Sequence, residues 1–352
     1  MTGHKKCTKS FKRYVMNNIL ISYGTRPEII KLSPIIRELI ERKIPFKTVF
    51  TGQHRELYDD VKELVPKPDH NLAIMKENQT LIDILSSISL RFGEILRSEN
   101  PDLLIVQGDT STVAISALIA FYEKVPVGHV EAGLRTYDLT SPFPEEGNRQ
   151  MVSRIASYNW APTELAAKQL KKENVGNITV TGNTVIDACK NFNYPISYEN
   201  KVLITLHRRE IFGIKMEKIF NEIELLALKH AELEFIFPMH PNPNVQKLKP
   251  ILKHVNVIDT LGYSKMMKLL ASVKFVISDS GGIQEECATF NKKVLVCRNT
   301  TERSEGINAG FAKLVDTDII NNFQWANDNP EWKGKNPFGD GKASKYIVDS
   351  II

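Results

Sequence analysis

The chain has 352 residues, of which 42% are hydrophobic and 25% are charged. That length exceeds what one hydrophobic core usually supports, and the composition is typical of a soluble globular protein, so we expect two domains. The formal net charge of +5 comes from a basic tail, residues 1–17, which carries five Lys and Arg residues and no acid. Because the rest of the chain is neutral, we expect no nucleic-acid partner, and we expect the tail itself to be disordered.

Strands and helices alternate through the first expected domain, residues 18–190. An apolar run at 19–22 predicts a strand, and a turn with Pro27 leads into a helix at 28–42 whose apolar residues recur at helical spacing. Alternation of this kind predicts a parallel, doubly wound sheet. The other expected strands are 46–50, 103–106, 125–130 and 178–180, and the other expected helices are 55–64, 81–98, 111–122 and 146–158.

The alternation restarts after 191–200, a stretch rich in Asn, Tyr and Pro, so we expect a second domain at 200–335. The fold class is therefore α/β, with two Rossmann-like domains facing a central cleft, where ligands often bind. The last segment, 336–352, is expected to form a closing helix near its end and to pack back across the domains. The expected strands are 202–206, 235–237, 255–258, 275–277 and 293–296, and the expected helices are 216–228, 264–271 and 283–289.

No stretch of the sequence approaches the roughly 20 apolar residues that span a bilayer, so we expect no membrane partner. The basic tail has no apolar segment like that of a secretory signal. The four cysteines, Cys7, Cys189, Cys287 and Cys297, have neither disulfide nor zinc spacing. We therefore expect a cytoplasmic protein without a metal site.

Three acids stand in short stretches of unusual composition. Asp109 and Glu131 follow predicted strands, and Glu145 precedes a predicted helix. Active sites of open α/β sheets form at the carboxyl ends of strands, so these acids predict acid/base chemistry on a small molecule. The alternative is that they cap helices or pair with Arg135 and Arg149.

The segment 278–286 runs from a predicted strand directly into a helix. Its Ser280, Gly281 and Gly282 expose backbone N–H groups, which suit a phosphate, and Glu286 can accept hydrogen bonds from sugar hydroxyls. The alternative is a simple helix cap. A serine-protease interpretation does not fit the strand-to-helix context, and the sequence has neither a dinucleotide fingerprint nor a P-loop, so we expect no nicotinamide or ATP cofactor.

Two histidines follow predicted strands in polar surroundings. His207 stands beside Arg208 and Arg209, which suit a negatively charged ligand, although an ion pair with Glu210 competes with that interpretation. His240 is the second. None of the eight histidines has metal-ligand spacing.

These motifs resemble the non-hydrolysing UDP-N-acetylglucosamine 2-epimerases, which have the two-domain GT-B fold. The resemblance runs from residue 18 to the C-terminus. It rests on the segments 24–28 with Lys31, 53–55, 108–110, 126–136, 141–146, 181–184, 207–210, 279–286, 300–303 and 336–341.

The resemblance implies a role for each matching residue, a UDP-sugar substrate, no cofactor and a homodimer. Asp109, Glu131 and Glu145 are implied as catalytic acids and bases, together with His207 as a catalytic residue. The implied substrate-binding residues are Arg26, Ser280, Gly281 and Gly282 with His207 on the UDP phosphates, Glu286 on the ribose, and Lys31 and Arg303 lining the site.

The sequence departs from the family at several positions. Met266 stands where the family has a Phe near the uracil, and Ser304 replaces a Pro. Met can still pack against a base, so we expect UDP binding to persist. Gln53, Arg208 and His240 match a regulatory UDP-GlcNAc site of bacterial members, whereas Glu56 and Asn78 do not. We therefore expect weak or absent allosteric activation.

The chemistry of C2 inversion suits this residue set. The C2 proton of an N-acetylhexosamine has no neighbouring carbonyl to stabilise a carbanion, so we expect UDP to leave, a 2-acetamidoglucal to form, and UDP to return. The expected reaction is UDP-GlcNAc to UDP-ManNAc. Alternatives are C2 epimerisation of a 6-deoxy UDP-2-acetamido hexose, a GT-B glycosyltransferase, and a non-enzymatic UDP-sugar sensor.

Overall fold

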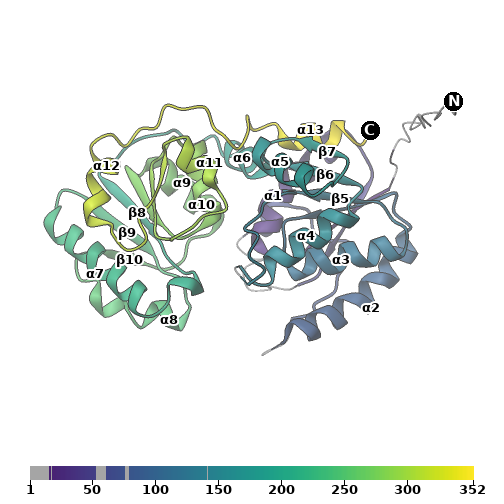
Figure 1. Cartoon of the computed structure of the whole chain (residues 1–352), viewed down its shortest axis with the longest axis horizontal. Helices are drawn as coiled ribbons and strands as arrows, with labels where there is room; N and C mark the ends of the chain where they lie inside the picture. The colour runs from purple at the N-terminus through teal and green to yellow at the C-terminus, as the bar shows by residue number, and fades with distance from the viewer. Residues whose placement is uncertain (1–15, 17, 53–60, 76–78, 141) are drawn as a thin grey trace, which may run out of the picture.

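The computed structural model describes residues 16, 18–52, 61–75, 79–140 and 142–352. Over those residues the chain forms two parallel β-sheets with helices on their faces, which lie side by side as two lobes (Figure 1). The predicted α/β fold with two doubly wound sheets is confirmed. Apart from Met16, the basic tail lies outside the described residues, so its expected disorder stays a prediction.

The first sheet has the strand order β3-β2-β1-β4-β5-β6-β7. We call this sheet with its helices the N-terminal lobe. Its strands are β1 (Ile19–Tyr23), β2 (Phe46–Phe50), β3 (His70–Asn71), β4 (Leu103–Gln107), β5 (Val127–Val130), β6 (Tyr158–Ala161) and β7 (Ile178–Val180). Its helices are α1 (Arg26–Glu41), α2 (Leu81–Glu99), α3 (Ser111–Tyr122), α4 (Glu145–Ile155), α5 (Glu164–Lys172) and α6 (Thr184–Lys190).

The second sheet has the order β10-β9-β8-β11-β12-β13. With its helices it forms the C-terminal lobe. Its strands are β8 (Lys201–Thr205), β9 (Glu234–Pro238), β10 (Asn256–Ile258), β11 (Phe275–Ser278), β12 (Val294–Val296) and β13 (Ala312–Leu314). Its helices are α7 (Ile214–Lys229), α8 (Pro243–Gln246), α9 (Tyr263–Ser272), α10 (Gly281–Thr289), α11 (Ser304–Asn308) and α12 (Phe323–Asn327).

One apolar core joins the two lobes. It includes buried residues of α1 and α6 from the N-terminal lobe and of α9 and α10 from the C-terminal lobe. The closing helix α13 (Ala343–Asp349) belongs to the same core, although the chain enters it from the C-terminal lobe. The described residues form three further cores: one with α2, α3 and α4, one with α7 and α12, and a small one with α5.

Several predicted elements differ from the structure. The helix predicted at 146–158 ends at Ile155, because Tyr158–Ala161 forms the buried strand β6, whose four residues are too few to show an alternating pattern. Helices α5 and α6 were not predicted. Of the helix predicted at 55–64, residues 55–60 lie outside the described residues, and Lys62–Leu64 forms a 3-10 turn. Within the described ranges, no helix is long and apolar enough to cross a membrane.

Candidate active site

The site lies where the carboxyl ends of the two sheets face one another. Asp109 and Glu131 follow β4 and β5 of the N-terminal lobe, as predicted. His207 follows β8, and Ser280 links β11 to α10 in the C-terminal lobe. In each parallel sheet the carboxyl ends of the strands share one edge, and the two edges are linked by ion pairs of Lys31 with Glu285 at 3.6 Å and of Arg303 with Glu131 at 3.9 Å.

Glu131 is the most enclosed of the three acids. It is 9% exposed, and its backbone adopts the left-handed region with φ 66°. Lys31 Nζ lies 2.5 Å from its Oε1 atom, which also accepts a hydrogen bond of 2.9 Å from Asn183 Nδ2. Gln107 Nε2 donates to the other oxygen at 2.5 Å. Burial alone would raise the pKa of Glu131, but the charges of Lys31 and Arg303 outweigh it and hold the pKa below its usual range.

A buried charge cluster extends from Glu131 into the C-terminal lobe. Arg303 Nε donates to Glu285 Oε1 at 2.9 Å, and an Arg303 terminal nitrogen lies 2.5 Å from Glu302 Oε1. Lys31 Nζ is also 3.6 Å from Glu285 Oε2, so a lysine of α1 bridges carboxylates of both lobes. The predicted lining residues Lys31 and Arg303 therefore lie together beside Glu131.

Asp109 has a more open position. Arg149 Nε donates to its Oδ2 atom at 2.7 Å, and Asn148 Nδ2 donates to its backbone carbonyl at 2.8 Å. The preceding turn is held by His129, whose Nε2 donates to the Gly108 carbonyl at 2.7 Å. Burial lowers the pKa of His129 to about 4, so this ring is neutral at physiological pH. The ion pair with Arg149 that the sequence left open is present, whereas Arg135 pairs with Glu173 instead.

Glu145 and Glu146 have different environments. Glu146 is fully buried and accepts hydrogen bonds from the backbone N–H groups of Thr136 and Tyr137 and from Arg149. By contrast, the Oε2 atom of Glu145 is buried without a hydrogen-bond partner among the described residues, and burial raises the pKa of this carboxyl group. The Glu146 carboxylate is occupied by hydrogen bonds that stabilise a loop. Glu145 is therefore the candidate of the two for chemistry.

The start of α10 is shaped by its first two residues, Gly281 and Gly282. A Cβ atom at Gly281 would lie 2.5 Å from an Arg303 terminal nitrogen, so only glycine leaves room for that guanidinium. A Cβ atom at Gly282 would meet nothing within 4 Å, so this residue faces open space. The first N–H groups of a helix have no partner inside the helix, and the open space at Gly282 lies beside those of this nine-residue helix.

His207 and His240 stack with ring centroids 5.5 Å apart. The loop that carries His207 is held by Asp279, whose Oδ2 atom accepts the backbone N–H groups of His207 and Arg208 at 2.7 and 2.8 Å. Burial lowers the pKa of His240, and the charges of His207 and Arg26 lower it further. Arg26 is the first residue of α1, and its charge acts on His240 of the C-terminal lobe.

The remaining predicted residues have separate positions. Burial raises the pKa of Glu286 to about 7, with the Tyr263 hydroxyl and the charge of Arg26 opposing the shift. Met266 is buried in the core between the lobes, so its contact with a base stays a prediction. Arg208 lies 3.9 Å from Glu302, at the edge of the charge cluster.

Three residues considered for the regulatory site, Gln53, Glu56 and Asn78, lie outside the described residues.

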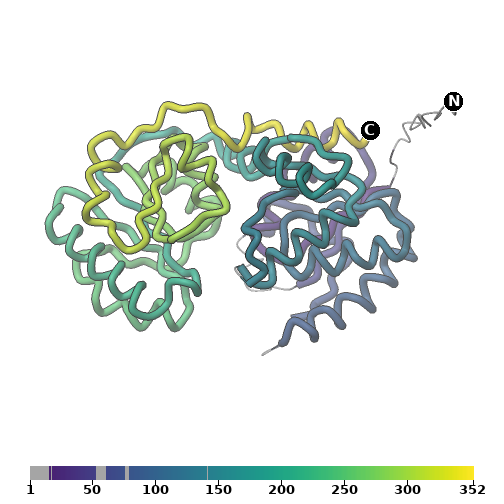
Figure 2. Tube along the Cα trace, in the orientation of Figure 1, coloured from purple at the N-terminus to yellow at the C-terminus, as the bar shows by residue number. Residues whose placement is uncertain are grey.

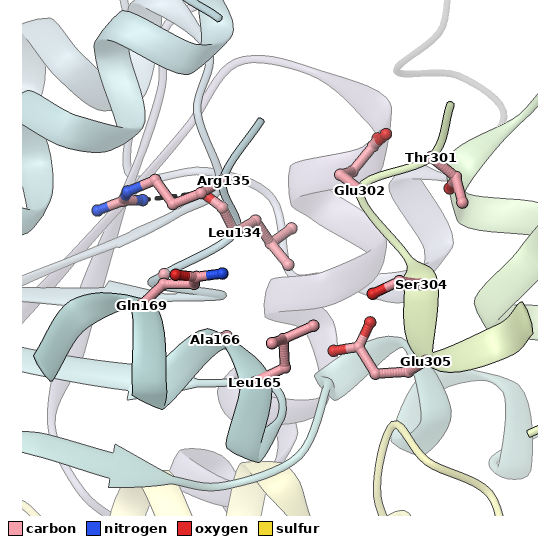
Figure 3. Close-up of a pocket in the computed structure, with 10 residues that line it drawn as sticks. Leu134, Arg135, Leu165, Ala166, Gln169, Thr301, Glu302, Ser304 and Glu305 are labelled. Carbon is pink, nitrogen blue, oxygen red and sulfur yellow. Dashed lines mark hydrogen bonds between the residues drawn. The ribbon is translucent and has the colours of Figure 1, made fainter. Parts of the chain in front are cut away.

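A cavity of about 100 Å³ lies between the lobes beside the charge cluster (Figure 3). The side chains of Leu165 and Glu305 extend toward one another across it. Thr163 Oγ1 donates to Glu305 Oε1 at 2.5 Å and links the lobes at this edge. The lining residues are Gly133, Leu134, Arg135, Leu165, Ala166, Gln169, Thr301, Glu302, Ser304 and Glu305.

The sequence interpretation missed the contribution of Glu28, although it lies in a motif that carried the family resemblance. The Glu28 carboxylate accepts hydrogen bonds from Gly24 N at 2.7 Å, Thr25 Oγ1 at 2.9 Å and Thr110 Oγ1 at 2.6 Å. It therefore ties the turn that carries Arg26 to the turn that carries Asp109. Burial raises the pKa of Glu28 to about 7 despite these hydrogen bonds.

The comparisons with known proteins agree with this geometry. The family model described as UDP-N-acetylglucosamine 2-epimerase matches residues 37–352. The UDP-N-acetylglucosamine 2-epimerase of Salmonella borreze is 41% identical over 96% of this chain and 98% of its own, and that of Bacillus subtilis is 41% identical over 95% and 94%.

Solved structures give the same result. The UDP-GlcNAc 2-epimerase of Neisseria meningitidis bound to UDP-GlcNAc matches with a TM-score of 0.86 at 38% identity, covering 95% of this chain and 99% of that one. The Methanocaldococcus jannaschii UDP-GlcNAc 2-epimerase in complex with UDP-GlcNAc and UDP matches with a TM-score of 0.81 at 33% identity, with coverages of 95% and 99%.

The raised pKa of Glu28 predicts a pH-dependent effect of its substitution on stability. The folded state binds the Glu28 proton more tightly than the unfolded state does, so protonation of Glu28 stabilises the fold. This contribution to the free energy of unfolding is fully present below the unfolded pKa and is lost as pH rises through about 7. Glu28→Gln removes this titration. Relative to wild type, the free energy of unfolding of the variant should therefore increase between pH 5 and pH 8, by roughly 2 to 3 kcal/mol, because only wild type loses stability over this range.

Urea unfolding at both pH values measures this difference. The control is Glu41→Gln, at the exposed end of the same helix, whose effect should be equal at both pH values. An equal effect of Glu28→Gln at both values would contradict the prediction.

Proposed function

Because the chain belongs to the UDP-N-acetylglucosamine 2-epimerase family, we propose that it interconverts UDP-GlcNAc and UDP-ManNAc by inverting C2. The observation that carries this proposal is the position of Glu131. This buried carboxylate is paired with Lys31 and Arg303 at the meeting point of the two lobes, across from the open turn at Gly282. A carboxylate held beside a phosphate-binding turn suits proton transfer on a nucleotide sugar.

We propose that the reaction proceeds by elimination and re-addition. A base removes the C2 proton while the bond from C1 to the UDP oxygen breaks, so that a C1–C2 double bond forms and UDP leaves with the bonding electrons. UDP then adds back to C1 of this 2-acetamidoglucal, and an acid delivers a proton to the opposite face of C2. The route is redox neutral. It requires a base, an acid and retention of UDP between the two steps.

The environments of the acids support a division of these roles. The pKa of Glu131 is lowered and that of Glu145 is raised, so one carboxyl group favours the ionised form and the other favours the protonated form. Two groups whose pKa values are pushed apart are suited to act as base and acid. We assign the ionised partner to Glu131, the protonated partner to Glu145, and a second proton-transfer role to Asp109.

The UDP group is proposed to bind the C-terminal lobe. The phosphates are assigned to the start of α10 at Ser280, Gly281 and Gly282, because the first N–H groups of a helix have no partner inside it and Gly282 borders open space, although Ser280 N already donates to Ser278 Oγ at 2.9 Å. Arg26 and His207 are assigned to the phosphates as cationic and hydrogen-bonding groups, and Glu286 is assigned to the ribose. Retention of UDP there separates epimerisation from hydrolysis.

We propose UDP-GlcNAc rather than a 6-deoxy sugar as the substrate, because the relatives described above are named for UDP-GlcNAc. A glycosyltransferase needs one base and an acceptor groove, which does not explain the number of acids. The protein is proposed to act in the cytoplasm, and the three described cysteines are free thiols, as expected in a reducing compartment.

We also propose that the chain forms a homodimer through α2 and α3. These helices lie side by side, linked by the Arg97–Glu123 ion pair at 2.8 Å. They expose large apolar side chains, including Ile82 at 72%, Leu90 at 74% and Tyr122 at 72%. An apolar surface of this kind suits a subunit interface.

Proton NMR of UDP-GlcNAc in heavy water with the pure protein tests the proposed reaction. Epimerisation should produce UDP-ManNAc signals and replace the C2 proton of both sugars with deuterium. Retained C2 protons and an unchanged sugar would exclude the reaction. Transfer without C2 exchange would instead support a glycosyltransferase.

Asp109→Asn should separate catalysis from binding. The amide cannot exchange a proton as a carboxylate does, so we expect turnover to fall by at least about 10²-fold. UDP binding, measured by calorimetry, should persist because UDP is proposed to bind the other lobe. Unchanged turnover would remove Asp109 from the mechanism.

Leu90→Lys should weaken the proposed dimer. A charge at the centre of an apolar contact is left without a partner, so we expect the dimer dissociation constant to rise on the order of 10-fold or more. Light scattering over a range of protein concentrations measures this. Ile214→Lys is the control, because Ile214 is 88% exposed on α7 of the C-terminal lobe and should leave the mass unchanged. A monomeric wild type would contradict the proposal.

We propose that regulation by UDP-GlcNAc is weak or absent, because Glu56 and Asn78 depart from the family's regulatory site. Initial rates with UDP-ManNAc alone should follow a hyperbolic curve. A strict requirement for added UDP-GlcNAc would contradict this expectation.

A further inference from the structure

The C-terminal segment, residues 331–352, spans both lobes. Its trace runs along one edge of the molecule from the C-terminal lobe and ends beside the N-terminal lobe (Figure 2). On the C-terminal lobe, Trp332 Nε1 donates to the Ala309 carbonyl at 2.9 Å. The rings of Trp332 and Phe338 pack on Phe311, with centroid distances of 4.8 and 6.3 Å. The segment is thus anchored before it leaves this lobe.

A second set of contacts anchors the segment to the N-terminal lobe. Asp187 on α6 accepts the Ser344 hydroxyl at 2.6 Å and the Ser344 backbone N–H at 2.9 Å. Trp160 Nε1 on β6 donates to Ser350 Oγ at 2.9 Å. The stretch between the two anchors, residues 336–341, is therefore held at both ends.

Within that stretch, the backbone lies directly against the turn before α6. Asn183 N donates to the Phe338 carbonyl at 2.7 Å. A Cβ atom at Gly339 would lie 3.0 Å from Gly182 Cα, and one at Gly182 would lie 3.2 Å from Gly339 Cα. Gly182 and Gly339 also have φ values of +88° and +124°, which favour glycine. Because neither residue has a side chain, the backbones of Gly182 and Gly339 can lie in direct contact.

Asn183 connects this contact to Glu131. Its Oδ1 atom accepts the Val185 backbone N–H at 3.1 Å, which fixes the orientation of the side-chain amide. Its Nδ2 atom consequently points to Glu131 Oε1 and donates to it at 2.9 Å. Asn183 is 2% exposed, so this hydrogen bond is shielded from bulk solvent.

We propose that residues 336–341 and Asn183 form a positioning element for Glu131. The inference rests on the proposed function, because it assigns a catalytic role to Glu131. The C-terminal stretch holds the backbone of Asn183 from one side, the start of α6 holds its side-chain oxygen, and the remaining amide N–H orients the carboxylate. Asn183 is a positioning residue in this arrangement and takes no proton itself.

The positioning element acts on the pKa of Glu131 as well as on its geometry. A hydrogen bond to the ionised form of a buried carboxylate favours that form. Loss of the Asn183 donor should therefore raise the pKa of Glu131 and shift the acid limb of the kcat profile to higher pH. A residue that only supports the fold would lower stability without moving this limb.

Asn183→Ser tests the donor separately from the helix cap. Serine can still cap α6 and keeps the backbone N–H that donates to Phe338, but its side chain is too short to reach Glu131. We expect kcat for UDP-GlcNAc epimerisation to fall by on the order of 10-fold, with the acid limb shifted upward. The dissociation constant of UDP, measured by calorimetry, should stay within about 2-fold because the phosphate-binding turn is untouched.

Gly339→Ala tests the contribution of the C-terminal stretch, with Gly310→Ala as the matched control. Gly310 also has a positive φ, +82° against +124° at Gly339, but a Cβ atom there would meet nothing within 4 Å. Both substitutions place a Cβ atom at a positive φ, and the backbone cost is larger at Gly339, but only Gly339→Ala also pushes the stretch away from Gly182. We expect Gly339→Ala to shift the acid limb in the same direction as Asn183→Ser, and Gly310→Ala to leave the pH profile unchanged.

The outcomes are separable. An inactive wild type would overturn the proposed reaction. An active wild type whose kcat and acid limb are unaltered by Asn183→Ser would overturn the positioning role of Asn183 alone. Equal pH profiles for Gly339→Ala and Gly310→Ala would overturn the role of residues 336–341. If Gly339→Ala does not fold, the Asn183→Ser result still decides whether the donor positions Glu131.

Discussion

The ion pair of Lys31 with Glu131 is the contact on which the site depends. Both side chains are buried, and a buried charge is costly unless it is paired and hydrogen-bonded. The pair is completed from the C-terminal lobe by Arg303 and Glu285, so the cluster loses partners if the lobes separate. The charges of Lys31 and Arg303 lower the pKa of Glu131. Because Arg303 belongs to the other lobe, the ionisation of Glu131 depends on the contact between the lobes.

The sequence predicted the parts of this arrangement that follow from local pattern. Apolar runs placed Asp109 and Glu131 at the ends of β4 and β5, because a buried parallel strand is continuous in hydrophobicity. The partners of Glu131 were not predictable in this way. Asn183 reaches it from 52 residues away, and Lys31 from 100, and neither separation leaves a periodic signal.

Glu145 and Glu146 also show how far local sequence pattern can predict the site. Glu145 and Glu146 are chemically alike, and the helical pattern gave no reason to prefer one for chemistry. The structure separates them through backbone donors: Thr136 and Tyr137 satisfy Glu146, whereas Glu145 Oε2 has no partner among the described residues. Those donors belong to a loop whose path depends on tertiary packing, so the distinction appears only after folding.

The backbone conformations around Glu131 explain why so many supports surround one carboxylate. A non-glycine residue in the left-handed region costs about 1 to 3 kcal/mol and persists only where its surroundings determine it. Gln107, Asn183 and Lys31 approach Glu131 from a strand end, a helix cap and a helix. Because these groups belong to separate elements, no single loop movement can release the carboxylate. Its proton affinity is therefore set by packed contacts from both lobes, because Arg303 of the C-terminal lobe also lowers the pKa of Glu131.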